Sequence, residues 1–124
     1  MNPYYVVFFA PAIEKRLVEV SKLLAHAGYI EEDPTRLSGR ALGMAVSNGM
    51  IKYSKEIGFP TTLSEVPGFT EKHIQRCLEA AKNPKLESKL KNMPVPLTAA
   101  LVDKYMGSIL QAAKNGDMSL IMNL

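Results

Sequence analysis

Apolar residues recur every three or four positions along most of the chain, which is the spacing of one face of an α-helix. No segment alternates apolar and polar residues over a length that suits a β-hairpin. The pattern therefore predicts an all-α protein of about five helices in antiparallel-type packing. We expect residues 1–124 to form a single helical domain.

The first clear helical pattern runs from residue 13 to residue 27. Pro11 suits a position near its start, and Gly28 suits the left-handed residue that follows a helix. The predicted inner face consists of Ile13, Leu17, Val20, Leu24 and Ala27.

A second helix is predicted after Ser38, which can act as its N-cap. Its predicted inner face consists of Leu42, Ala45, Val46, Met50, Tyr53 and Ile57. Gly39, Gly43 and Gly49 each lower the intrinsic helix propensity by roughly 1 kcal/mol relative to alanine. Their presence indicates that another helix approaches this one closely.

The stretch Gly58–Thr70 separates the two halves of the chain. Gly58 is expected in left-handed conformation, and Pro60 prevents the helix from continuing. A short helical turn is predicted over residues 62–66, and Thr70 is the expected N-cap of the next helix.

Two long helices and a short one are predicted in the second half. The inner face of the helix after Thr70 is expected to be Ile74, Cys77, Leu78 and Ala81. Asn83-Pro84 ends this helix and begins the short one, and the prolines of residues 92–96 require extended backbone. Thr98 is the expected N-cap of the last helix, and Asn115-Gly116 its end. The apolar set of the last helix is Val102, Met106, Ile109, Leu110 and Ala113.

The run Tyr4–Ala10 is apolar throughout, so periodicity does not distinguish a buried strand from the end of a core-facing helix. Such a run at the start of a chain indicates that a partner surface covers it. We expect self-association, most simply as a dimer, through Tyr4, Tyr5, Phe8 and Phe9.

Charge and cysteine content narrow the class of protein. The net charge of +3 comes mostly from alternating charges over residues 71–91, which is typical of a solvated helical face rather than a nucleic-acid interface. A single cysteine suits a reducing compartment, and neither a signal peptide nor a membrane-spanning run is recognisable. We therefore expect a cytoplasmic protein that binds neither nucleic acid nor membranes.

The residues alone indicate no active site. His26 and His73 have no partner at ligand spacing, and both are interpreted as structural or exposed. Cys77 is expected to be a buried, inert thiol, and no glycine-rich phosphate-binding motif is present. No catalytic, cofactor-binding or metal-binding residue is therefore predicted in this chain.

Four segments, taken in order, resemble the C-terminal part of the iron-containing (group III) alcohol dehydrogenases. The most specific is Gly58–Glu65, G-F-P-T-T-L-S-E, followed by Ala80–Pro84 and Met93–Thr98. Asn2–Tyr5 resembles the chain just after the last metal ligand of that family. The resemblance extends over essentially the whole sequence.

The resemblance implies the helical subdomain of an NAD(P)-dependent alcohol–aldehyde oxidoreductase with the dehydroquinate synthase-like fold. In that family the metal, usually iron, and the nucleotide are bound by upstream residues that have no counterpart here. The resemblance therefore implies a chain that is inactive in isolation, whose partner is the remainder of the dehydrogenase or another copy of itself. By position, Lys91, Asn92 and Met93 would line the substrate channel.

An alternative interpretation is a stand-alone helical protein-interaction module without catalysis. Both hypotheses predict the same helices. The reading frame upstream of Met1, or the intact mass of the native protein, would distinguish them. A basic RNA-binding helical domain rests only on the net charge and is a much weaker third hypothesis.

Overall fold

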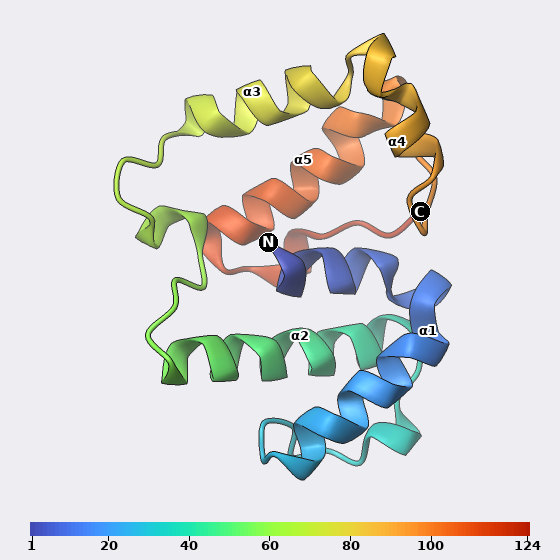
Figure 1. The fold of residues 1–124 in the computed structure, drawn as a ribbon, viewed down its shortest axis with the longest axis vertical. Coiled ribbons are helices and arrows are strands. Elements are labelled where there is room, and N and C mark those ends of the chain that lie inside the picture. Colours follow the sequence, from blue (N-terminus) through green and yellow to red (C-terminus); the bar gives the residue numbers. More distant parts are fainter. The chain divides into compact units, whose positions relative to one another are not determined.

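The computed structural model describes all 124 residues, and every regular element in it is helical (Figure 1). Five α-helices and four short 3-10 turns follow one another without a β-strand, which confirms the all-α prediction. None of these helices combines the length and the apolar character needed to cross a membrane. The chain divides into two compact units, residues 1–61 and residues 62–124.

The first unit contains helix α1 (Asn2–His26), the turn η1 (Pro34–Arg36) and helix α2 (Gly39–Glu56). The apolar run that could have been a strand forms the first turns of α1. Pro11 lies inside the helix, where its missing N–H and its ring disrupt the normal hydrogen bonding. The backbone of Ile13 leaves helical geometry at φ −118° and ψ 20°, and α1 is kinked there. The helix start expected near Pro11 is therefore the start of the second segment of α1.

The inner face of α1 differs from the predicted one. Leu17 and Ser21 are buried, whereas Val20 and Ala27 are exposed. The cause is the direction from which α2 packs, since it covers the row of α1 that includes Leu17 rather than the row of Val20. Ser21 is tolerated in this position because its hydroxyl donates a 2.7 Å hydrogen bond to the Val18 carbonyl.

Close approach of α1 and α2 was predicted from the glycines of α2, and it is confirmed at two of them. A Cβ atom built on Gly43 would lie 2.5 Å from the Cβ of Ala10, and one on Gly49 would lie 3.2 Å from Cδ1 of Leu24, which are both residues of α1. Gly39 has another role, because its φ is +50° and nothing lies within 4 Å of its Cβ position. One core cluster of this unit consists of Ala10, Leu17, Ile30, Leu42 and Val46.

The last turn of α2 lies beyond this core. Tyr53 and Ile57 are 48% and 60% exposed, so their predicted place on the inner face is wrong. Tyr53 packs edge-on against Tyr29, with ring centroids 5.6 Å apart. The predicted left-handed ends at Gly28 and Gly58 are confirmed, with φ values of +85° and +73°.

The aromatic residues at the start of α1 are better covered than expected. Tyr4 and Phe8 are only 2% and 1% exposed, so these two residues are already covered within the chain. Self-association through this segment stays a prediction. The Tyr4 hydroxyl donates a hydrogen bond to the carbonyl of Thr61. Tyr5 and Phe9 are half-buried and stack with ring centroids 5.6 Å apart. The helical form of this segment is what separates the buried pair from the half-buried pair, since the two pairs lie on neighbouring rows.

The second unit contains the remaining elements, and its longest helices pack against each other (Figure 1). These elements are η2 (Leu63–Glu65), α3 (Glu71–Ala81), η3 (Pro84–Leu86), α4 (Glu87–Lys91), α5 (Ala99–Asn115) and η4 (Met118–Leu120). The predicted helical turn at η2 and the predicted left-handed Gly116 after α5 are both confirmed.

Helices α3 and α5 are joined by polar contacts at both ends of α3. Lys82 pairs with Asp103 at 2.9 Å, and Lys114 pairs with Glu71 at 2.8 Å. Ile74 and Leu78 are the buried residues of α3. Cys77 is exposed, contrary to the prediction, because it lies on the flank of the row that faces α5.

The predicted buried positions of α5 are confirmed for Val102, Ile109, Leu110 and Ala113, and Met106 is half-buried. Tyr105, Gly107 and Ala112 are buried as well, so α5 is covered on more than one side.

Thr98 occupies the predicted N-cap position of α5 with extended backbone, but its side chain makes no capping hydrogen bond. Ser38 behaves in the same way before α2. Asn83 does cap the turn that follows it, since its Oδ1 accepts a 3.0 Å hydrogen bond from the Lys85 amide.

Candidate functional site

The segment that the sequence suggested as a substrate-channel wall lies at the end of α4. Lys91 is exposed and forms a 2.9 Å ion pair with Glu87, one helical turn earlier. Asn92 is the exposed C-cap of α4, and Met93 is half-buried. The three residues are therefore neighbours on one helix end rather than members of a converging cluster.

The backbone around this helix end is well defined by its hydrogen bonds. The Leu90 carbonyl accepts from the Leu97 amide at 3.1 Å, which returns the proline-containing segment to the end of α4. Leu90 and Leu97 are both buried and anchor the segment. The arrangement holds Lys91 and Asn92 at the surface, where both side chains are accessible to a partner or a ligand.

The residues with potential for acid–base or metal chemistry are dispersed. His26 is exposed in the last turn of α1, His73 lies in the first turn of α3, and Cys77 is an exposed free thiol. No group of three or more histidine, cysteine, aspartate or glutamate side chains is arranged to hold a metal ion.

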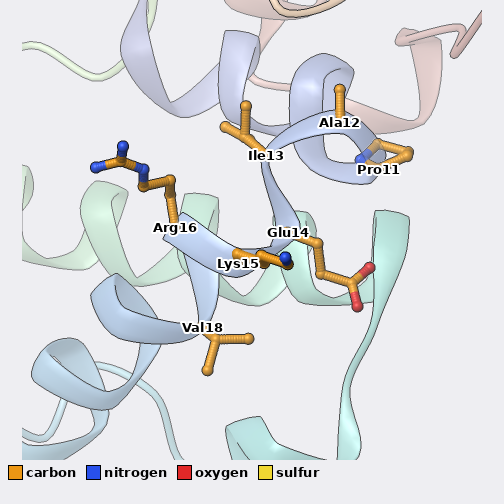
Figure 2. Close-up of a pocket in the computed structure, with 7 residues that line it drawn as sticks. All are labelled: Pro11, Ala12, Ile13, Glu14, Lys15, Arg16 and Val18. Atoms are coloured by element: carbon orange, nitrogen blue, oxygen red, sulfur yellow. The ribbon is translucent and has the colours of Figure 1, made fainter.

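One pocket of about 620 Å³ follows the kink of α1 and is lined by residues between Pro11 and Val18 (Figure 2). Figure 2 shows the Glu14 side chain directed away from Arg16. The Glu14 carboxylate is already used, because its Oε2 accepts a 2.7 Å hydrogen bond from the Gly39 amide at the start of α2. Glu14 therefore links the two helices by satisfying an N-terminal amide of α2, and this pocket holds no nucleophile–base pair.

A second pocket of about 350 Å³ lies between α2 and the loop that follows α1, with Ile30, Ala45 and Ile51 in its lining. Its lining contains both acidic and basic side chains, namely Glu31, Glu32, Lys52 and Lys55. Because both charges are present, the pocket favours neither an anionic nor a cationic ligand.

Tyr29 lies at the edge of this second pocket. Its hydroxyl donates a hydrogen bond to Glu56, and this bond raises the pKa of Tyr29 above its usual value. The shift makes the phenol a poorer acid, so Tyr29 is suited to hold Glu56 in place rather than to transfer a proton.

The structure therefore adds two features that the sequence did not reveal, the Glu14–Gly39 contact and the pair of pockets in the first unit. The Glu14–Gly39 contact and the second pocket join residues that are distant in the chain, whereas the first pocket is lined by neighbouring residues around the α1 kink. None of these features has a local sequence motif. No protein-family model matches the chain, and no match was found among curated proteins or among solved structures.

Proposed function

We propose that this chain is the C-terminal helical part of an iron-containing alcohol dehydrogenase and that it acts with the rest of such an enzyme. In this proposal the chain belongs to the helical subdomain of the dehydroquinate synthase-like fold. It supplies packing and part of the substrate channel, whereas the divalent metal and NAD(P) are bound by other residues of the enzyme. The reducing cytoplasm is the compartment that suits this role.

The proposal rests on where the resembling segments fall in the helical order. Gly58–Glu65 connects α2 to η2, Ala80–Pro84 ends α3, and Met93–Thr98 connects α4 to α5. These segments contain the prolines and the left-handed glycine that set helix boundaries. The fourth segment, Asn2–Tyr5, lies in the first turn of α1. A resemblance at helix joints, in the same order, supports common architecture more strongly than a resemblance within helices, where many sequences fit.

The surface of the first unit also supports a role in association. Leu23, Ile57 and Phe59 are 72%, 60% and 65% exposed. Where such side chains form one contiguous patch, they are typical of a site that another protein segment covers. This feature supports the stand-alone interaction module equally, so the distinction must come from catalysis.

The experiment is reconstitution from two chains. The purified protein is mixed with the nucleotide-binding and metal-binding part of an iron-containing alcohol dehydrogenase, expressed as a separate chain. Anaerobic Fe²⁺, NAD(P)⁺ and short alcohols are added, and formation of NAD(P)H is followed. We expect turnover from the mixture and none from either chain alone.

Two variants test whether the turnover depends on the proposed channel wall. Asn92→Ala should change the KM for the alcohol, because this residue is assigned to the channel wall. Lys85→Ala, exposed on the neighbouring turn, serves as the matched control and should leave KM unchanged. A complex that forms without turnover would favour the interaction module, and turnover or one tight equivalent of metal with the isolated chain would contradict the proposal.

A further inference from the structure

We propose that His73 makes the N-terminal cap of α3 sensitive to pH. The backbone amide of Thr70 donates a 3.0 Å hydrogen bond to Nδ1 of His73. A backbone amide can only donate, so Nδ1 must be the acceptor. This requires a neutral ring whose proton is on Nε2.

The arrangement is a capping box in which histidine takes the third helical position. Glutamate or glutamine is the usual residue there, and each offers an acceptor oxygen at neutral pH. Histidine offers an acceptor only while it is uncharged, and it is the side chain that normally changes charge between about pH 5 and about pH 8. The cap of α3 is therefore built from a group that loses its acceptor when it is protonated.

Protonation reverses the direction of hydrogen bonding at Nδ1. The charged ring carries a proton on both nitrogens, so the Thr70 amide loses its acceptor. The nearest acceptors for the new donor are Oγ1 and the carbonyl oxygen of Thr70, both 3.2 Å from Nδ1. The positive charge also lies in the first turn of α3, where the helix dipole disfavours a cation.

The charged groups around this turn do not replace the lost contact. Lys72 and Arg76 follow on α3, and both are basic. Glu71 is held by Lys114 and Gln111 of α5, at 2.8 Å and 2.6 Å. The ring of Phe69 stacks on the imidazole with centroids 5.8 Å apart, which keeps His73 next to the cap in either charge state.

The consequence reaches α5, because Glu71 is the first residue of α3 and carries its contacts to Gln111 and Lys114. If the first turn of α3 is less well ordered, Glu71 is held less firmly and both of its contacts to α5 become weaker. Acidification should therefore loosen the N-terminal end of α3 against α5, while the Lys82–Asp103 pair at the other end is retained.

Nuclear magnetic resonance on the intact chain tests the proposal. Ring nitrogen shifts at about pH 8 should report an unprotonated Nδ1 on His73. The protection of the Thr70 amide against hydrogen exchange, relative to an unstructured peptide, should fall several-fold as His73 becomes charged. The Thr70 amide shift should follow the same titration midpoint as the His73 ring.

Three variants complete the test. His73→Gln keeps an acceptor at all pH values, so Thr70 protection should become independent of pH, whereas His73→Ala should give low protection throughout. His26→Gln, at the exposed end of α1, should leave the pH dependence intact. A protonated Nδ1 at high pH, or Thr70 protection that does not respond to the charge of His73, would overturn the proposal.

Discussion

Replacing Gly43 by alanine tests whether the contact between α1 and α2 is as close as the structure indicates. The added Cβ would lie 2.5 Å from the Cβ of Ala10, and 3.3 Å from both the Val6 carbonyl oxygen and the Val7 Cα. Carbon atoms normally pack at about 3.5–4.0 Å, so the two helices must separate by about 1 Å. Ala10 has no rotamer that relieves the overlap, and the other neighbours are backbone atoms.

Two opposing effects set the magnitude. Alanine in place of glycine within a helix stabilises by about 1 kcal/mol. Overpacking of a buried contact typically costs about 1–3 kcal/mol, and the absence of any flexible side chain places Gly43 at the upper end. We therefore expect Gly43→Ala to lower the free energy of unfolding by about 1–2 kcal/mol.

Other glycines provide matched controls. A Cβ at Gly49 would meet Cγ1 of Ile30 at 3.1 Å and the terminal Cδ1 of Leu24 at 3.2 Å, and these flexible side chains can move aside. Gly49→Ala should be nearly neutral. Gly107 has only Leu78 at 3.9 Å, an ordinary contact distance, so Gly107→Ala should stabilise by up to about 1 kcal/mol.

Urea denaturation followed by far-ultraviolet circular dichroism gives the comparison. The double variant Ala10→Gly/Gly43→Ala moves the methyl group across the interface, and should recover at least about 1 kcal/mol relative to the sum of the single variants. If Gly43→Ala proved as stable as Gly49→Ala, or if the double variant showed no coupling, the proposed close contact would be refuted.

Three further predictions concern the second unit. Cys77 should react with a thiol reagent in the native protein nearly as fast as in denaturant, and protection until unfolding would contradict its exposure. In urea denaturation, Asn83→Ala should lower the free energy of unfolding by about 1 kcal/mol, because a capping hydrogen bond is lost. Thr98→Ala should lower it by only a few tenths of a kcal/mol, because the Thr98 side chain makes no such bond. The reverse order would disprove the assigned caps. The hydrogen bond from Lys114 lowers the pKa of Glu71. The contribution of Glu71 to stability is therefore fully present above the usual pKa range of a carboxyl group, and it is lost as the pH falls through the lowered pKa. Glu71→Gln should therefore lose less stability than the parent chain on acidification, and an unchanged pH profile would refute this.

Helix boundaries were predictable because they depend on residues within one turn of the boundary. Gly58 and Gly116 end helices in left-handed conformation, as their positions after apolar runs predicted. Thr70 was recognised as an N-cap for the same local reason. The three-residue and four-residue spacing of apolar residues was sufficient for the all-α class.

The candidate site was predictable only as a position in the chain. Lys91 and Asn92 could be suggested from a resemblance, but their exposure and their lack of convergence with other functional groups are spatial facts. The pocket beside the α1 kink was not predictable at all. It depends on how Pro11 and Ile13 redirect the helix, and on the use of Glu14 to bind the α2 amide.

Which face of each helix is buried was decided by tertiary packing. Val20, Tyr53 and Cys77 satisfy the helical spacing and are nevertheless exposed, while Ser21 is polar and fully buried. A helical stripe of apolar residues is wider than the area that one neighbouring helix covers, so its edges remain open to solvent. The neighbour's direction of approach selects the covered row, and the Gly43–Ala10 contact shows how small residues permit that approach.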